Sequence, residues 1–382
     1  MTTPTASTVL GADRVITPEH VHSPGWVAVD QGRIVGVGTG EPAWPVHDLG
    51  AVTLTPGFVD LHCHGGQGFS YSEGADAAHE ALLAHRRHGT TSMVASLATD
   101  TLESLARQLR DLAPLVAGEE LVGVHLEGPW LSDAHCGAHD ASLLRDPDPA
   151  EVTGLLDSAP GVVVMVTLAA ERPGGLATVE RLAARGVLAA LGHSDAGYEM
   201  AHAAIDAGAR VATHLFNAER ALHHREPGLV LALLERDEVT VELIADGVHL
   251  HPAVLRSAAV RKPSRFTLVT DAMAAAAVGD GDYLLGTSNV QVRNGVARLA
   301  GTGVLAGSIL TLDAALRHAV QVAGLDVVDA VAAVTRTPAD LLARPELGRL
   351  EPGARADLVV LDDRLEVRGV MRHGRWVGPS ER

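Results

Sequence analysis

The chain has 382 residues, of which 47% are hydrophobic and 20% charged, so it can bury the core of one large and one small domain and is neither disordered nor fibrous. Its formal net charge of −17, without a basic patch, argues against a nucleic-acid or anionic-membrane partner. No stretch approaches the roughly 18 apolar residues that a membrane span needs, and no secretion signal is evident. We therefore expect a cytoplasmic protein. Its two cysteines cannot form a disulfide framework.

Residues 1–54 alternate apolar and polar positions with a period of two, and Gly and Asp residues separate the runs. This pattern predicts antiparallel strands joined by tight turns. The segment is too short to bury a good core alone, so it needs another part of the chain to pack against.

Residues 55–345 alternate short, nearly continuous apolar runs with longer helical segments, as in a parallel sheet covered by helices. The predicted strands are PGFVDLHCH (56–64), TTSMVASLA (90–98), LVGVHLEG (121–128), VVVMVTLAAE (162–171), GVLAALGHS (186–194), RVATHLFN (210–217), VTVELIADG (239–247) and RFTLVTDA (265–272). Segments between them, such as 75–89 and 101–115, have helical apolar spacing and end near Gly or Pro. Eight strand-then-helix units predict an α/β fold, a (β/α)₈ TIM-type barrel.

Residues 346–382 return to period-two alternation with Gly and Asp turns. We predict that this segment pairs with residues 1–54 to form one small β-sandwich domain beside the barrel.

Polar residues of one chemical kind close five of the predicted barrel strands. The first strand ends with His62 and His64, whose i, i+2 spacing puts both imidazoles on one face and Cys63 on the other. The other strand ends carry Glu127, His193, His214 and Asp271. Active sites of such barrels lie at the carboxyl ends of the strands, and zinc-like ions take imidazole and carboxylate ligands. The pattern predicts a site for one or two divalent metal ions.

Each of these residues also has a structural interpretation when taken singly. His-x-His arises by chance in a chain with 20 histidines, a lone His193 would be a hydrogen-bonded strand end, and Asp271 could cap the next helix. Six candidates at five strand ends are much harder to obtain by accident, which favours the metal site.

Longer motifs surround these positions: PGFVDLHCHG (56–65), HLEGPWL (125–131), GAHD (137–140), LGHSDA (191–196), THLFNA (213–218), ADGVHL (245–250), LVTDAM (268–273), LAGSILTL (305–312) and GARADLVVLD (353–362). Through them the chain resembles the amidohydrolase superfamily and, within it, the N-acetylglucosamine-6-phosphate deacetylase family. The resemblance implies metal-dependent release of acetate from a phosphorylated amino sugar, in amino-sugar catabolism and cell-wall recycling.

The resemblance implies a role for each residue of the predicted site. Glu127, His193 and His214 would hold one divalent ion, with zinc expected, and His62 and His64 could hold a second with Glu127 bridging. Many relatives in the superfamily bridge two metals with a carboxylated lysine on strand four, but the single lysine here, Lys262, precedes strand eight. Asp271 would act as general acid and base. His139 would polarise the acetamide carbonyl, although it could also be a loop histidine facing water, and Cys136 lies in the same loop.

The resemblance also implies which residues bind the substrate: Ala138, Asn217, Ala218, Arg225, His249, Leu305 and Ala306. An arginine suits the phosphate because its guanidinium matches two oxygens at once, and in relatives this arginine can come from a second subunit, which implies a homodimer. One departure stands out, since Glu219 and Arg220 occupy positions where relatives commonly carry a methionine. An acid beside a phosphate pocket is unfavourable unless a nearby cation offsets it.

Two alternatives remain open at this point. A related amidohydrolase could deacetylate an unphosphorylated amine or amino acid, in which case Arg225 would have no substrate role. A non-catalytic metal-binding homologue would be expected to lack the base, whereas Asp271 is present.

Overall fold

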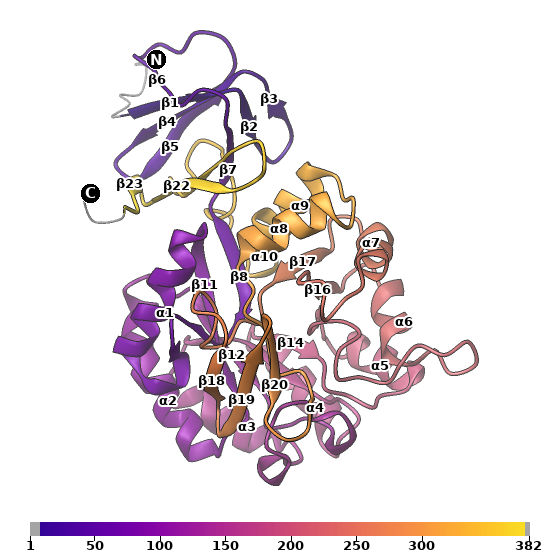
Figure 1. Cartoon of the computed structure of the whole chain (residues 1–382). Helices are drawn as coiled ribbons and strands as arrows, with labels where there is room; N and C mark the ends of the chain where they lie inside the picture. Colours follow the sequence, from indigo (N-terminus) through magenta and orange to yellow (C-terminus); the bar gives the residue numbers. More distant parts are fainter. Residues whose placement is uncertain (1–7, 379–382) are drawn as a thin grey trace.

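An eight-stranded parallel barrel forms the larger part of the computed structural model, which describes residues 8–378 (Figure 1). The first seven residues of the predicted 1–54 segment and the last four of the predicted 346–382 segment lie outside the described residues. The barrel strands are β8 (Phe58–Cys63), β11 (Thr90–Ala98), β12 (Gly123–Glu127), β13 (Val163–Leu168), β14 (Leu188–Leu191), β15 (Val211–Ala212), β16 (Thr240–Ile244) and β17 (Phe266–Val269). They lie side by side in chain order, so all eight predicted strands are confirmed.

The barrel closes where its last strand meets its first. The backbone N–H of Asp271 donates to the carbonyl of His62 at 2.8 Å, and Cys63 forms a parallel bridge with Ala272. Deep beside this seam, Thr270 Oγ1 donates to the buried carboxylate of Asp60 at 2.7 Å. The closure therefore brings the carboxyl ends of β8 and β17 together.

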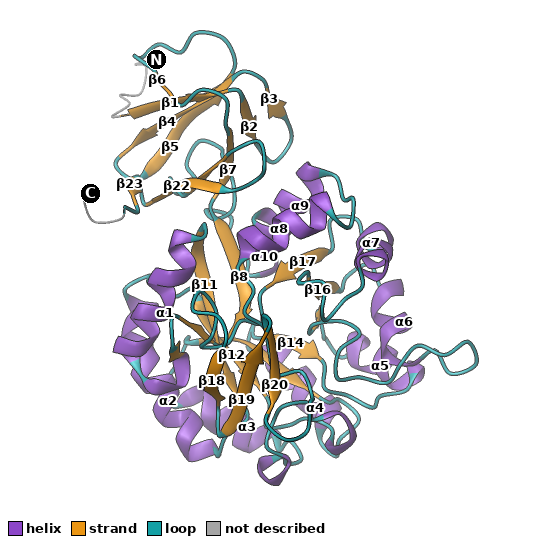
Figure 2. Ribbon diagram, viewed as in Figure 1, coloured by secondary structure: helices purple, strands orange, loops and turns teal. Residues whose placement is uncertain are grey.

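A helix follows each barrel strand and covers the outside of the sheet (Figure 2). These helices are α1 (Ala75–Arg87), α2 (Leu102–Ala117), α3 (Pro149–Asp157), α4 (Gly175–Ala184), α5 (Tyr198–Asp206), α6 (Gly228–Glu235), α7 (Pro252–Arg261) and α8 (Leu312–Gln321), with α9 (Val327–Val334) and α10 (Arg336–Leu341) after them. Their starts carry local signals, because Thr101 caps α2 through its side chain, and Asp148 caps α3 with Pro149 in its first turn.

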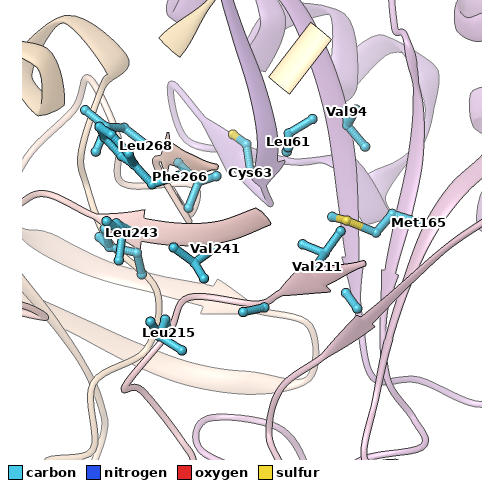
Figure 3. Close-up of a cluster of buried hydrophobic side chains, with 14 of the residues drawn as sticks. Leu61, Cys63, Val94, Met165, Val211, Leu215, Val241, Leu243, Phe266 and Leu268 are labelled. Carbon is cyan, nitrogen blue, oxygen red and sulfur yellow. The ribbon is translucent and has the colours of Figure 1, made fainter. Parts of the chain in front are cut away.

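The core lies between the sheet and these helices. Figure 3 shows part of it, where Leu61, Cys63, Val241 and Leu268 gather as buried side chains. Burial raises the pKa of the Cys63 thiol to about 12, so this cysteine is an inert packing residue. Because side chains alternate along a strand, Leu61 and Cys63 on the helix side leave His62 for the barrel interior.

Two smaller sheets lie beside the barrel, and one of them combines strands from both chain ends. One sheet has the order β5-β4-β1-β6, and the other the order β23-β22-β21-β7-β2-β3. Their bounds are β1 (Thr8–Ala12), β2 (Arg14–Ile16), β3 (Val21–His22), β4 (Gly25–Asp30), β5 (Arg33–Gly38), β6 (His47–Asp48), β7 (Thr53–Pro56), β21 (Leu358–Leu361), β22 (Val367–Arg372) and β23 (Arg375–Trp376). The antiparallel pairing of β21 with β7 joins the two ends, so the predicted fold class is confirmed.

A three-stranded antiparallel sheet between β17 and α8 was not predicted. It consists of β18 (Gly281–Leu285), β19 (Ser288–Arg293) and β20 (Val296–Leu299), and we call residues 281–299 the hairpin insert. Shorter elements lie around the barrel mouth: β9 (Gly65–Gly66), β10 (Phe69–Ser70) and the 3₁₀ turns Tyr71–Glu73, Asp133–His135 and Ala141–Leu143. Within residues 8–378, none of the helices is both long and apolar enough to cross a membrane.

Candidate active site

The predicted metal residues converge at the carboxyl end of the barrel. His193, His214 and Asp271 all have positive φ angles, of 48°, 28° and 47°. Side chains other than glycine rarely adopt this conformation, and such strain concentrates at functional sites. Each of these residues lies two positions after the end of a strand, so the bend turns its side chain into the barrel mouth.

Glu127 is the centre of the group. Its Oε1 lies 3.2 Å from His193 Nε2 and 3.1 Å from His214 Nε2. Its Oε2 lies 3.2 Å from His64 Nε2 and 3.3 Å from His139 Nε2. Asp271 Oδ1 completes the set at 3.3 Å from His64 Nε2. His62 Nε2 also lies 3.5 Å from Oε1 of Glu127. One buried carboxylate thus faces five imidazole rings, which is the arrangement expected of a shared metal ligand.

The second nitrogen of two rings is already engaged, which fixes the atom that faces Glu127. Nδ1 of His193 lies 2.9 Å from the carbonyl of His135, and Nδ1 of His62 lies 3.1 Å from Oε2 of Glu242. The carbonyl of His135 and a carboxylate of Glu242 accept, so Nδ1 of each ring carries a hydrogen and Nε2 is the atom that faces the carboxylates. A divalent cation between these Nε2 atoms and the carboxylate oxygens would satisfy both, so these residues fit a divalent metal.

The electrostatics agree with this fit. Burial lowers the pKa of His62, but the charges of Glu127 and Asp271 outweigh burial and raise it well above the ordinary value. Burial likewise lowers the pKa of His64, but the hydrogen bonds that its ring donates to Asp271 and Glu127 outweigh burial and bring this pKa to about 9. The two Nε2 atoms lie only 3.2 Å apart, so two imidazolium charges would repel each other. One divalent cation satisfies the same carboxylates without that repulsion.

In His139 the roles of the two ring nitrogens are reversed. The backbone N–H of Thr99 donates to its Nδ1 at 3.3 Å, so the hydrogen of the neutral ring sits on Nε2 and points into the site. Burial lowers the pKa of His139, with only partial compensation from Glu127, which favours this neutral form. His139 is therefore a hydrogen-bond donor in the site rather than a lone-pair ligand.

A cavity of about 250 Å³ opens above this group. Most of the predicted site residues line it: His64, Glu127, Ala138, His139, His193, His214, Asn217, Ala218, His249, Asp271 and Leu305. His62 lies beneath it, fully buried. His249 is oriented by Asp246, whose Oδ2 lies 2.7 Å from its Nδ1, and the amide of Asn217 donates to the carbonyl of His214 at 3.0 Å.

Besides His62, three of the named residues do not line this cavity. Arg225 is exposed on the loop before α6, with its Nη1 2.8 Å from His224 Nε2. Ala306 is fully buried among residues of the hairpin insert, and Cys136 is half-buried one residue before the lining begins at Gly137. A single copy of the chain therefore does not bring Arg225 to the cavity.

Glu219 does not oppose an anion in the cavity, contrary to the concern that its sequence position raised. Its side chain is buried away from the lining and accepts a hydrogen bond from the backbone N–H of Phe216. Burial raises its pKa to about 8, despite that hydrogen bond, so it is uncharged at neutral pH.

Sequence reasoning missed several residues that shape the site. Glu242 orients His62, and the ring of His125 packs edge-on against His62 at 4.6 Å. Both are polar residues inside apolar strand runs, and this pattern in the sequence indicates buried polar contacts. The turn Leu285–Ser288 of the hairpin insert also lines the cavity. Its period-two alternation and the Asn294-Gly295 pair are hairpin signals.

Comparison with known proteins gives a consistent picture. Residues 53–377 match the model of the amidohydrolase family. An N-acetylgalactosamine-6-phosphate deacetylase of Escherichia coli O157:H7 is 36% identical over 96% of this chain and 98% of its own length. An N-acetylglucosamine-6-phosphate deacetylase of Bos taurus is 38% identical over 87% of this chain and 85% of its own.

A solved structure extends the similarity to three dimensions. It is a substituted form of N-acetyl-D-glucosamine-6-phosphate deacetylase from Mycobacterium smegmatis, in complex with N-acetyl-D-glucosamine-6-phosphate. It is 47% identical, with a TM-score of 0.95, and the match covers 98% of this chain and 100% of that one.

Proposed function

The chain belongs to the amidohydrolase family, and from this premise we propose that it hydrolyses the acetamide of N-acetyl-D-glucosamine 6-phosphate. Water adds to the carbonyl carbon, the carbon–nitrogen bond breaks, and acetate and D-glucosamine 6-phosphate leave. The observation that carries the proposal is the ring of imidazoles around Glu127 at the floor of a cavity, in a chain similar to deacetylases over nearly its whole length.

Glu127, His193 and His214 would hold one divalent ion, and His62 and His64 a second, with Glu127 shared between them. Zinc is the metal we propose, because imidazole and carboxylate ligands in this number suit it. Such an ion supplies Lewis-acid polarisation and lowers the pKa of water at the site. The protein fixes the ligands from behind, since Glu242 and the carbonyl of His135 set the orientation of two rings.

Asp271 is the proposed general base and acid. Its carboxylate is 7% exposed and lies beside His64 at the floor of the cavity. In this role it accepts a proton from the attacking water and later gives that proton to the leaving amine nitrogen. His139 donates from Nε2 toward the same space, which suits stabilisation of the negative charge that develops on the carbonyl oxygen.

The sugar end of the substrate is proposed to lie against Ala138, Asn217, Ala218, His249 and Leu305, which line the cavity. We propose that the chain forms a homodimer in which Arg225 of one copy binds the 6-phosphate of the substrate held in the cavity of the other copy. Its exposure and its distance from its own cavity lining support supply from a partner. The buried, uncharged Glu219 removes the electrostatic objection to a phosphate at this place.

The 4-epimer is a second candidate substrate, because the relative from Escherichia coli O157:H7 is named for N-acetylgalactosamine 6-phosphate. An acetate-release assay on both N-acetylhexosamine 6-phosphates and both unphosphorylated sugars, with metal analysis of the same sample, tests the proposal. Acetate from neither phosphorylated sugar would reject it, and equal rates without phosphate would favour a deacetylase of neutral amines.

We also propose a cytoplasmic location, where phosphorylated sugars are retained, and a division into a catalytic barrel of residues 55–345 and a β-domain of residues 1–54 and 346–382. Two free cysteines suit a reducing compartment.

A further inference from the structure

A second cavity adjoins the candidate active site on the side of His64. It has a volume of about 210 Å³, far above the roughly 10–15 Å³ that one water molecule needs. His64, Ala98, Thr99 and the turn Leu285–Thr287 line both cavities, so the two cavities adjoin at these residues. None of the five residues proposed for the sugar end lines the second cavity. It therefore adjoins the candidate active site at His64 and shares no lining residue with the proposed sugar end.

Hydroxyl groups dominate its lining. Ser70 and Ser72 come from the segment after β8, with their Oγ atoms 2.9 Å apart. Ser96 comes from β11 and accepts from the backbone N–H of Cys63 at 3.1 Å. Together with Thr99 and Thr287 they make a polar passage rather than an apolar gap. Such a lining can solvate a small ion or water along its length.

A carboxylate and a guanidinium, those of Asp100 and Arg107, line this cavity. Asp100 is its carboxylate, but Oδ1 accepts from Thr101 N at 2.7 Å and Oδ2 from Gln108 Nε2 at 2.9 Å. Arg107 is exposed, and its one recorded contact goes to the hydroxyl of Ser104 at 2.9 Å. Within residues 8–378 it forms no ion pair with a carboxylate, so its guanidinium is available to an anion, although the carboxylate of Asp100 lines the same cavity.

We propose that this cavity is the exit for acetate and the entry for water. The inference rests on the proposed function, because the acetyl group would react at His64 and Asp271 while the sugar phosphate fills the outer part of the main cavity. Acetate formed there lies behind the amino sugar and cannot pass it. The second cavity gives acetate a separate way out, past the serine hydroxyls toward Arg107.

The proposal fixes the order in which the products leave. Acetate leaves first, while D-glucosamine 6-phosphate still occupies the main cavity, and the amino sugar leaves last. Acetate should then inhibit non-competitively against N-acetylglucosamine 6-phosphate, and D-glucosamine 6-phosphate competitively. If both products used the main cavity, the amino sugar would have to leave first and acetate would be the competitive inhibitor. That pattern in the metal-loaded wild-type enzyme would overturn the proposal.

Variants of the passage give a second test that leaves the metal residues untouched. Ser72→Leu fills the cavity, so kcat should fall about tenfold while the single-turnover rate of acetate formation changes less than about twofold, because release becomes rate-limiting. Acetate inhibition should become competitive. Ser72→Ala removes the same hydroxyl without filling the space, so it separates bulk from hydrogen bonding. An unchanged kcat and inhibition pattern in Ser72→Leu would contradict the passage.

Arg107 tests the outer end from an exposed helical position, where folding is not at risk. Arg107→Ala should weaken acetate inhibition by about three- to tenfold, since a charge-assisted contact is lost. Arg110→Ala, an exposed arginine on the same helix outside the cavity lining, is the matched control and should leave inhibition unchanged. Equal effects of the two variants would mean that only net charge matters. Absence of acetate in a single turnover of the wild type would instead reject the proposed function itself.

Discussion

Arg220 donates two parallel hydrogen bonds to Asp195, from Nε to Oδ1 at 3.0 Å and from Nη2 to Oδ2 at 2.9 Å. The same Oδ1 lies 3.1 Å from His135 Nε2. Asp195 therefore ties the loop after β15 to the loop that carries His139. Because its guanidinium is already engaged in this bidentate pair, Arg220 is a poor candidate for the phosphate, and Arg225 is the arginine to test.

Arg225→Ala should cost activity only on phosphorylated substrate. We expect kcat/KM for N-acetylglucosamine 6-phosphate to fall by about two to three orders of magnitude, since a bidentate phosphate contact is lost, with little change for N-acetylglucosamine. Steady-state kinetics on both sugars measures the difference. Equal losses on both would assign Arg225 to structure or assembly.

Mixing two inactive variants tests whether Arg225 acts in a second subunit. Asp271→Asn keeps the arginine, and Arg225→Ala keeps the base. If the arginine is supplied by a partner, a hybrid dimer contains one complete site, and activity on the phosphorylated sugar should reappear on mixing, toward about a quarter of wild type at random assortment. Mixtures no more active than the sum of their parts would place Arg225 in its own site.

Asp271→Asn should preserve folding and metal content but lower turnover by at least about two orders of magnitude, because the amide cannot accept the proton. Circular dichroism, metal analysis and acetate release on one preparation test these three expectations. Near-normal turnover would remove Asp271 from the role of base.

The two histidine pairs should differ in their effect on metal content. His193→Ala or His214→Ala should abolish tight binding of one ion, because each removes a direct ligand from a site with few spares. The double variant His62→Ala, His64→Ala should lose at most one ion and keep partial activity. Plasma emission analysis after gel filtration gives the stoichiometry. Unchanged stoichiometry in the single variants would refute the ligand assignment, and loss of all metal in the double variant would show interdependent ions.

Glu242 should tune the metal without touching it. Glu242→Gln keeps the shape but weakens the acceptor for His62 Nδ1, and we expect about 10- to 100-fold weaker binding at the site that His62 shares. Competition with a chelator measures the affinity. The control is Glu80→Gln, an exposed glutamate on α1, and equal affinities for the two variants would leave Glu242 without this function.

Glu219 should make stability depend on pH. Its folded-state pKa of about 8 exceeds the ordinary 4.5, so the folded chain binds the proton more tightly than the unfolded chain. Its contribution is fully present below about pH 4.5 and is lost as the pH rises to about 8, by at most about 1.4 kcal/mol per pH unit. Glu219→Gln cannot ionise and should gain stability relative to wild type across this window. Urea unfolding at several pH values tests this, and a constant difference between the two proteins would contradict it.

The barrel could be predicted because its strands are short apolar runs at regular intervals, separated by helical segments. This repeating strand-then-helix pattern is visible in the sequence alone. The hairpin insert was missed because strand signals at 281–299 lie after the eighth barrel strand, where the repeating pattern gives no place for them. Its burial is also one-sided and mixed with polar residues, so apolar content alone does not reveal it.

The site was predictable to the extent that its residues sit at strand ends. Glu242 and His125 were missed because they lie within strands, where their function depends on which ring they face across the barrel. The hydrogen-bond partner of Nδ1 decides which nitrogen of each histidine ring carries the hydrogen, and that partner is known only from the three-dimensional structure. The position of Arg225 outside its own cavity likewise depends on the path of one loop, which residue type does not determine.

A single residue, Gly57, separates β7 of the small β-domain from β8, the strand that delivers His62 and His64. A Cβ at Gly57 would lie 2.2 Å from Oγ1 of Thr91 in the barrel and 2.9 Å from Cβ of Asp357, which precedes β21. The backbone at Gly57 is therefore packed too closely against both residues to accept a side chain. The terminal sheets consequently cannot be treated as a detachable module in protein engineering. A chimera of this barrel with another β-domain would have to keep the one-residue connection at Gly57. Otherwise β8 would shift along its own axis, and His62 and His64 would no longer lie opposite Glu127.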